Sequence, residues 1–426
     1  MRTAPNRRQT LALLTGGMLA GVGLPRAAKA AVDPGQRRFL FVFVDGGWDT
    51  TYCLAPVFDN AAVDMPADGV LATAGGLSWV SGASRPAVDD FFLRYGQYTA
   101  IVHGMEVRSI AHERCKRLLF TGGSQPDDFP SLLAAASPEH LPLGHLVIRG
   151  PSYAGSAASS VVRIGQSGQL SALLDGTLFA GSREGHALPA EAVRQEQAAL
   201  VAARLARARG EAGLGAQSRL YEGYERMLDD WAQIPSVSDV LDVSVSDAST
   251  QIQAGLELLA SGISRCVLVS DRGFEDLRWD HHTELTRQSP SYQGLFTNLT
   301  FLMQELERRP GLTSDRLLDE VTVVVFSEMN RFPVLNGSGG KDHWTTTSLM
   351  LMGGGIRGDQ VVGAYNADMG GIPVVPDTGE LDESGTSGVL IDPSHIGATL
   401  LHLAGVDPGP ILGAEMEPLT CLLEDG

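Results

Sequence analysis

The feature that most restricts the fold is a set of short apolar runs, each long enough for one strand, separated by segments of helical composition. In the first run, the residues from Phe39 to Val44 are apolar without a break. A strand buried on both faces gives such an unbroken run, whereas a strand with one wet face alternates apolar and polar residues. The runs predict strands at 38–44, 98–104, 264–271, 320–328 and 348–355.

Helical segments lie between these strands. The predicted helices are 87–93, 110–121, one or two within 188–232, 248–262, 292–309 and 393–405. Strands that alternate with helices predict an α/β fold with a doubly wound, mostly parallel sheet flanked by helices. Hydrophobic residues make up 43% of the chain, which is enough for the core of a single domain at 31–426. Residues 126–235 interrupt the rhythm and predict a partly helical insertion.

Residues 1–30 predict a removable twin-arginine signal peptide. Arg7 and Arg8 precede an apolar run at 11–24, and the small residues at 28–30 match a cleavage site. A twin-arginine pair directs an already folded protein out of the bacterial cytoplasm. We therefore expect a periplasmic or secreted protein with no stable membrane anchor after cleavage. The alternative interpretation is an uncleaved anchor.

The chain is acidic, with 32 Lys and Arg residues against 50 Asp and Glu residues and a formal charge of −18. Such a charge repels nucleic acid, so we expect no nucleic-acid partner. An anionic substrate remains compatible, because a bound metal reverses the local field. The four cysteines form no C-x-x-C pair, which argues against a zinc knuckle or a redox motif and leaves any disulfide pairing open.

Polar side chains gather just after four of the predicted strands. Open α/β sheets place their ligands at the carboxyl ends of the strands. Carboxylates and imidazoles together are ligands for zinc, iron and manganese. Each residue alone has an ordinary structural explanation, such as a turn or a surface pair, but their convergence on one edge favours a metal site. The residues are Asp45, Asp49, Ser109, His112, Asp280, His281, His282, Glu328, Asp342 and His343.

Several other chemistries lack their motifs. The chain contains no G-x-S-x-G nucleophile elbow and no G-x-x-x-x-G-K-[ST] phosphate loop. The Cys/Ser-x-Pro-x-Arg segment of formylglycine sulfatases is also absent. These absences leave metal-assisted chemistry as the leading interpretation.

The motifs together resemble those of a family of exported bacterial proteins called domain of unknown function 1501, relatives of the alkaline phosphatase and sulfatase superfamily. The matching pieces are the leader, "GGWD" (46–49), His112 with Gly122 ten residues later, "WDHH" (279–282) and "SEMNRFPVLNGSGGKDH" (327–343). Two positions depart from the family pattern. Ala111 stands where the family has a serine, and the arginine motif is loosened to "EMNR".

The resemblance implies an alkaline-phosphatase-like fold and a metal-dependent hydrolase that acts on phosphate or sulfate esters, either small molecules or groups on a polymer. One or two divalent ions would be bound, zinc foremost, with manganese, magnesium, calcium or iron as alternatives. Asp45, Asp342 and His343 would hold one ion. Asp45 is preferred to Asp49 as this ligand because it directly ends the strand.

Other residues complete the site that the resemblance implies. Asp280 and His282 would help hold a second ion, with His281 as a further candidate ligand. Glu328 would bind a metal or support a ligand. Ser109 would be the nucleophile, with His112 as the other catalytic residue. The competing hypothesis is a non-catalytic exported binding or assembly protein that kept the fold, and Ala111 favours it.

Overall fold

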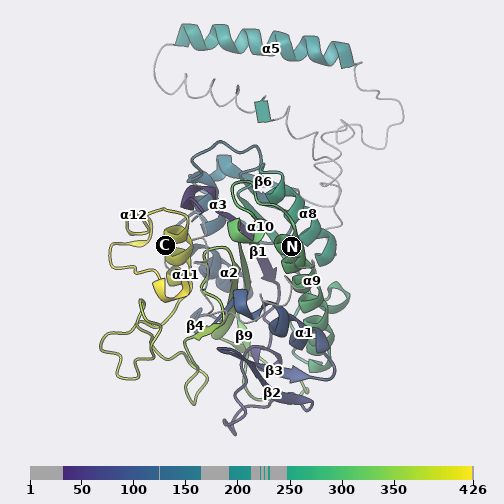
Figure 1. Ribbon diagram of the computed structural model, residues 1–426, viewed down its shortest axis with the longest axis vertical. Helices are drawn as coiled ribbons and strands as arrows, with labels where there is room; N and C mark the ends of the chain where they lie inside the picture. Colours follow the sequence, from purple (N-terminus) through teal and green to yellow (C-terminus); the bar gives the residue numbers. More distant parts are fainter. Residues whose placement is uncertain are drawn as a thin grey trace, which may run out of the picture. The chain divides into compact units, whose positions relative to one another are not determined.

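A mixed sheet of eight strands forms the centre of the protein (Figure 1). The computed structural model describes residues 32–123, 125–164, 191–212 and 247–424, together with residues 221, 225, 229 and 230. The strand order is β12-β4-β11-β8-β1-β7-β5-β6. The strands are β1 (Arg38–Val44), β4 (Thr99–Glu106), β5 (His145–Val147), β6 (Val161–Arg163), β7 (Cys266–Asp271), β8 (Val321–Ser327), β11 (Thr346–Gly353) and β12 (Gln360–Val362).

Most neighbouring strands of this sheet run parallel. β1 pairs in parallel with β7 and β8, β5 with β6 and β7, and β12 with β4. Among the strands that the structure describes in this sheet, β11 alone runs antiparallel to its neighbours β4 and β8. The predicted fold class, a mostly parallel sheet flanked by helices, is therefore confirmed.

Strand β1 shows why the apolar run in the sequence does not alternate. All seven of its residues are buried. The side chains of Leu40, Val42 and Val44 enter one core cluster, and those of Phe39, Phe41 and Phe43 enter a second cluster on the opposite face. Both faces of the strand are covered, so neither face selects polar residues.

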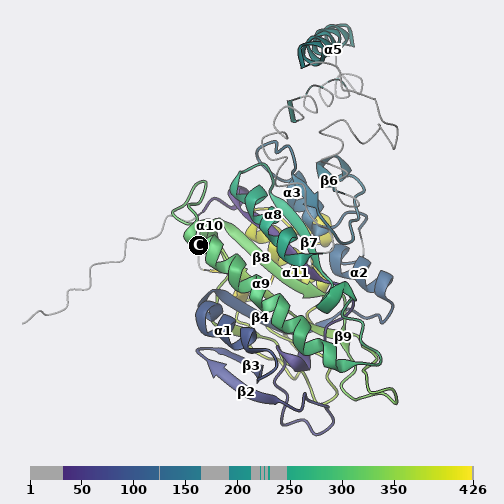
Figure 2. The ribbon, with the colours of Figure 1, turned by 90° about the vertical axis from the view of Figure 1, so that its right-hand side faces the viewer.

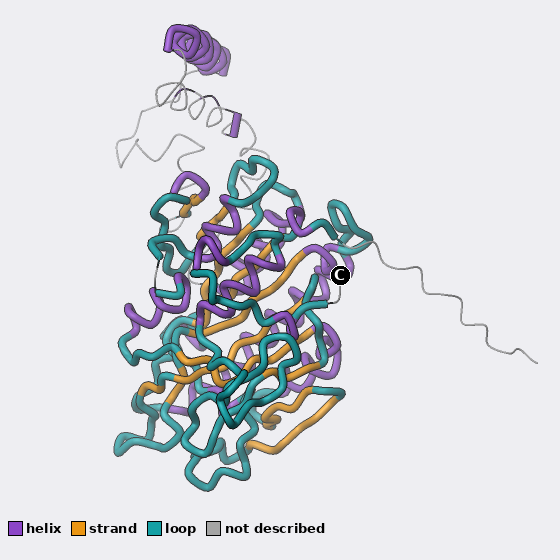
Figure 3. Tube along the Cα trace, turned by 90° about the vertical axis from the view of Figure 1, so that its left-hand side faces the viewer, coloured by secondary structure: helices purple, strands orange, loops and turns teal. Residues whose placement is uncertain are grey.

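Helices cover the two faces of the sheet. Figure 2 shows α8 (Ala248–Ala260) and α9 (Gln288–Arg308) in front of the strands, and their apolar residues join the first cluster with those of α1 (Pro86–Tyr95) and α10 (Leu317–Glu320). The second cluster takes residues from α2 (His112–Thr121), α3 (Phe129–Ala135) and α11 (Pro393–Leu403). Figure 3 shows this opposite face, where long loops accompany the helices. The arrangement is the doubly wound one that the sequence predicts.

The sequence did not predict two small antiparallel pairs. One is the hairpin of β2 (Gly69–Ala74) and β3 (Leu77–Gly82). The other joins β9 (Asn330–Arg331) to β10 (His343–Trp344) and so brings two distant stretches together. The described residues also form α5 (Glu191–Ala212) and the short α12 (Gly409–Leu412).

The segment expected as an insertion, 126–235, divides into two parts. Its first part supplies α3, β5 and β6, of which the two strands belong to the main sheet. Much of its second part, like residues 1–31 with the predicted leader, lies outside the described residues. No helix in the described part of the chain has both the length and the apolar character needed to cross a membrane. All four cysteines are buried and free.

One edge of the sheet collects the chemistry-bearing segments. The carboxyl ends of β1, β4, β7 and β8 point to this edge. Because β11 is antiparallel, its first residue, Thr346, lies beside Glu106 at the end of β4. The residues that precede β11, including His343, are therefore delivered to the same edge.

Candidate metal centre

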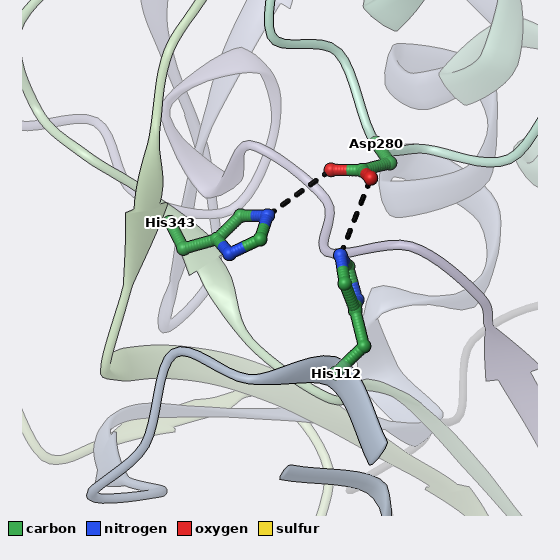
Figure 4. Close-up of side chains that lie close together, drawn as sticks. All are labelled: His112, Asp280 and His343. Atoms are coloured by element: carbon green, nitrogen blue, oxygen red, sulfur yellow. Dashed lines mark hydrogen bonds and ion pairs between the residues drawn. The ribbon is translucent and has the colours of Figure 1, made fainter. Parts of the chain in front are cut away.

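Three side chains from distant parts of the sequence converge at this edge (Figure 4). His112 is the first residue of α2, Asp280 follows β7, and His343 lies on β10. One potential ligand atom from each lies within 4.8 Å of the others. His343 Nε2 is 3.1 Å from Asp280 Oδ1, and His112 Nε2 is 3.3 Å from Asp280 Oδ2.

His282 adds a fourth donor to this group. Its Nε2 lies 3.1 Å from Asp280 Oδ1 and 2.9 Å from His343 Nε2. Ligands around one tetrahedral ion lie about 3.4 Å apart when each bond is about 2.1 Å long. Three imidazoles that share one carboxylate are a donor set that suits a divalent ion such as zinc. We refer to His112, Asp280, His282 and His343 as the His/Asp cluster.

Each histidine of the cluster contacts an oxygen atom through Nδ1, the ring nitrogen that does not face Asp280. His112 Nδ1 lies 2.9 Å from Glu328 Oε1, and His282 Nδ1 lies 3.2 Å from Asp342 Oδ1. His343 Nδ1 lies 2.7 Å from the carbonyl oxygen of Ile110. All three Nε2 atoms face Asp280, while each Nδ1 has an oxygen partner. This is the arrangement of metal-binding histidines, whose second nitrogen donates to a carboxylate or carbonyl that fixes the ring.

Asp280 is held by a buried arginine. Arg331 Nη2 donates to Asp280 Oδ1 at 2.8 Å and also to the carbonyl oxygen of Gly46, and its Nε donates to the carbonyl oxygen of Gly47. Arg331 comes from the loosened "EMNR" motif, yet it reaches the centre of the site. It ties the turn after β1 to the carboxylate of the cluster.

The charges of the cluster favour a cation. Burial alone would raise the pKa of Asp280, but hydrogen bonds from His112 and His343 and the charge of Arg331 hold that pKa well below its usual range. Burial opposes protonation of His112, yet Asp280 and Glu328 raise its pKa to about 9. A field that favours an imidazolium ion also favours a metal ion at the same place, because both are positive.

Gly46, the first of the two glycines after β1, is needed for close backbone packing. Gly46 has φ +128°, and a Cβ there would lie 2.6 Å from the backbone nitrogen of Trp279. A side chain would therefore push away the segment that carries Asp280. The amide of Gly46 also donates to both carboxylate oxygens of Glu328, at 3.0 and 3.1 Å.

Asp49, the aspartate of "GGWD", has a structural contact instead of a place in the cluster. Its Oδ2 lies 2.9 Å from Lys341 Nζ, and both side chains are completely buried. Lys341 Nζ also donates to Thr51 Oγ1 and to the carbonyl oxygen of Asp64. Lys341 directly precedes Asp342 and His343, so this pair fixes the start of the ligand-bearing segment.

Asp45 ends β1 as the sequence indicates, and its carboxylate contacts three cations. Lys116 Nζ and Arg278 Nη2 each lie 3.0 Å from Oδ1, and Arg272 Nε lies 3.7 Å from Oδ2. The predicted partner Asp342 has a side chain that is 65% exposed and contacts His282 and Asn336. Asp342 therefore borders the cluster, whereas Asp45 belongs to a neighbouring group of charges.

Ser109 and His281 lie beside the cluster without joining it. Ser109 Oγ accepts a hydrogen bond from the backbone of Ala111 at 3.3 Å and contacts the thiol of Cys115. His281 is buried, and burial together with the charge of Arg331 lowers its pKa to about 4. Of the predicted site residues, the structure thus brings together His112, Asp280, His282 and His343. Glu328 contacts Nδ1 of His112, and Asp342 contacts Nδ1 of His282.

The basic residues of the site were not predicted from the sequence. Lys116, Arg272 and Arg278 carry no motif and come from a helix and a loop far apart in the chain. A signal was present for Lys116, which follows His112 by four residues and so shares its helix face. Arg278 lies two residues before Asp280, inside a segment already singled out.

Comparisons with known proteins concern the fold and the family. The solved structures similar to this chain include the soluble domain of lipooligosaccharide phosphoethanolamine transferase A from Neisseria meningitidis, at 12% identity and a TM-score of 0.41, covering 93% of this chain and 97% of that chain. PsFucS1 sulfatase from Pseudoalteromonas sp. is similar at 14% identity and a TM-score of 0.33, covering 91% of this chain and 72% of that chain. Similarity at this level does not establish a shared activity.

A search among curated proteins finds no match. The profile of one family, described as "Protein of unknown function (DUF1501)", matches residues 94–412. The matched region contains all four residues of the His/Asp cluster. Because the match covers most of the chain, the protein belongs to the DUF1501 family, the family that its motifs resemble.

Proposed function

We propose that this protein is an exported, metal-dependent hydrolase of phosphate or sulfate esters. The observation that carries the proposal is the orientation of the three histidines, each with Nε2 toward Asp280 and Nδ1 held by an oxygen. Hydrogen bonding alone does not account for two Nε2 atoms, those of His282 and His343, at 2.9 Å from each other and both at 3.1 Å from the same carboxylate oxygen. A shared cation would account for it.

The His/Asp cluster would hold the ion, with zinc as the first candidate and manganese, magnesium, calcium or iron as alternatives. When bound, a divalent ion polarises an ester oxygen and makes water a better nucleophile at neutral pH. Arg331 keeps Asp280 oriented, and Glu328 and Asp342 fix the rings of His112 and His282. These supporting contacts are what a stable coordination geometry requires.

Water is the nucleophile that fits this geometry best. The hydroxyl of Ser109, the predicted nucleophile, is engaged with Ala111 and Cys115 on the side of the helix start. Ala111 at the family's serine position removes the other hydroxyl that could have attacked. Attack by water would break the bond between the phosphorus or sulfur atom and the alcohol oxygen, and the alcohol would leave with a proton.

Export is part of the proposal. The twin-arginine leader at 1–30 would carry the folded, metal-loaded protein out of the cytoplasm and would then be removed. The substrate would then be an ester in the periplasm or outside the cell, either a small molecule or a group on a polymer.

Metal analysis and turnover by the purified mature protein test the proposal. We expect bound divalent metal and hydrolysis of an aryl phosphate or aryl sulfate, and we expect Asp280→Ala to abolish both. The second candidate, a non-catalytic binding or assembly protein, is favoured by Ala111. Metal-loaded protein that turns over neither ester would support this candidate, and protein without metal would exclude the hydrolase.

A further inference from the structure

Three basic side chains surround the carboxylate of Asp45 beside the His/Asp cluster. We refer to Lys116, Arg272 and Arg278 as the cationic subsite. Lys116 and Arg278 contact Asp45 Oδ1 at 3.0 Å, and Arg272 approaches Oδ2 at 3.7 Å. These side chains are 12%, 25% and 30% exposed, so the group is partly open to solvent.

This arrangement does not fit Asp45 as a metal ligand. Its two oxygens are already occupied by fixed cations, and a metal ion placed there would be repelled by all three. Each cation also has a second carboxylate nearby: Lys116 lies 3.3 Å from Glu113, Arg272 lies 3.1 Å from Asp276, and Arg278 lies 3.9 Å from Glu328. The side chain of Glu113 is 85% exposed, so its pair with Lys116 is weakened by solvent and an incoming oxyanion can replace it.

The cationic subsite adjoins the His/Asp cluster. Lys116 lies one helical turn after His112 on the same face of α2. Arg278 Nη2 lies 3.9 Å from Glu328 Oε1, the oxygen that is 2.9 Å from His112 Nδ1. Helix α2 and the loop after β7 thus deliver His112, Asp280 and His282 of the cluster together with all three cations, so that one ligand molecule could contact both groups.

The backbone and one unpaired donor indicate that Arg278 has a function. Glu275, Asp276 and Arg278 have φ values of +59°, +58° and +68°, in the left-handed region that residues other than glycine rarely adopt. Such strain concentrates at binding sites. Arg278 Nε is buried and has no hydrogen-bond acceptor among the residues that the structure describes, which points to an acceptor that a ligand or water would supply.

We propose that the cationic subsite binds the oxyanion of the substrate and stands in place of a second metal ion. This inference rests on the proposed function, because it assigns the phosphoryl or sulfuryl group of the ester to these residues. Phosphate and sulfate share the tetrahedral oxyanion that the planar fork of an arginine and the ammonium group of a lysine recognise. The site then combines one ion with three fixed positive charges.

Binding of inorganic phosphate to the mature protein, measured by isothermal titration calorimetry, tests the subsite. Arg278→Gln and Lys116→Gln should each weaken binding about tenfold or more, as expected for a lost charge-assisted hydrogen bond. Arg308→Gln is the matched control, since Arg308 is exposed and pairs with Glu305 on α9. Equal affinity in all four proteins, or no binding of phosphate by the unaltered protein, would overturn the inference.

The variant Asp45→Asn distinguishes a cationic subsite at this position from a second metal site. Removing this carboxylate should leave the metal content unchanged at one ion per chain and should tighten phosphate binding, because the cations lose a competitor. A fall in metal content, or two ions per chain in the unaltered protein, would show that Asp45 is a ligand and would contradict the inference. Phosphate binding that depends on Lys116 and Arg278 in a protein without metal would refute the hydrolase and retain the subsite.

Discussion

Lys341 and Asp49 form an ion pair, with Nζ 2.9 Å from Oδ2, in which both side chains are completely buried. The pair joins the turn after β1 to the segment that carries His343. It also explains why two aspartates follow the first strand. Asp45 faces the cations at the edge of the sheet, and Asp49 anchors the loop that brings in a candidate metal ligand.

Lys341→Met should destabilise the protein by about 3–5 kcal/mol, because it leaves the carboxylate of Asp49 buried without a counter-ion. Chemical denaturation gives the free energy of unfolding. The double variant Lys341→Met/Asp49→Asn removes the buried charge while keeping an acceptor for Thr51, and it should lose less stability than the single variant. A double variant that is less stable than Lys341→Met would contradict this explanation.

His343→Ala and Asp342→Asn should differ in their effect on metal binding. His343 presents Nε2 to the His/Asp cluster, so its removal should abolish stoichiometric binding. Asp342 contacts Nδ1 of His282 rather than the Nε2 that faces Asp280, and it is largely exposed, so its loss should weaken the affinity by about 10- to 100-fold, as for other supporting residues. Titration with zinc against a chelating dye measures both. Equal losses would place Asp342 among the ligands.

Ser109→Ala should leave the turnover of an aryl ester unchanged. The hydroxyl of Ser109 accepts a hydrogen bond from the backbone of Ala111 and contacts the thiol of Cys115. Steady-state kinetics of this variant, with Asp280→Ala as the inactive control, measure the effect. A loss of turnover in Ser109→Ala as deep as that of the control would restore Ser109 as the nucleophile.

Export should depend on the twin-arginine pair. Replacing both Arg7 and Arg8 with lysine should keep the protein in the cytoplasm, because the route reads the arginine pair and not charge alone. Cell fractionation and immunoblotting locate the protein, and N-terminal sequencing of the exported form should begin at Ala31. Unchanged export of the double-lysine variant would exclude this route.

The sheet could be predicted from the sequence because burial on both faces leaves a direct trace. All seven residues of β1 and all seven of β8 are buried, and their sequences, RFLFVFV and VTVVVFS, are accordingly dominated by apolar residues without alternation. The hairpin of β2 and β3 left no such trace, since Val70 and Leu71 are exposed. A strand with apolar residues on its wet face has no clear period.

The sequence allowed us to predict which edge of the sheet carries the metal centre, but not the role of every residue there. We could predict that His112, Asp280, His282 and His343 lie near one another, because a parallel sheet brings the carboxyl ends of its strands to one edge. The direction in which Asp45 points could not be predicted. The orientation of Asp45 depends on contacts with long basic side chains from α2 and from the loop after β7. No periodic pattern in the sequence shows which carboxylate such side chains contact.

The buried histidine of β4, His103, should make the stability depend on pH. Burial lowers its pKa to about 4, and its Nδ1 is hydrogen-bonded to Ser348 Oγ at 2.8 Å. In the unfolded chain the imidazole binds a proton near pH 6.5. Between pH 6.5 and pH 4 the unfolded state therefore holds more protons than the folded state, and the free energy of unfolding falls as the pH is lowered.

The contribution of His103 is at most about 3 kcal/mol over this interval, at 1.36 kcal/mol for each pH unit. Denaturation curves recorded between pH 7.5 and pH 4 should show the decline. The glutamine of His103→Gln cannot titrate but can still form a hydrogen bond with Ser348. The variant should therefore reduce the fall in the free energy of unfolding below pH 6.5 and leave the pH dependence above pH 7 unchanged. If the variant keeps the full pH dependence of the unaltered protein, another group carries the effect, and His103 must be able to take up a proton in the folded state.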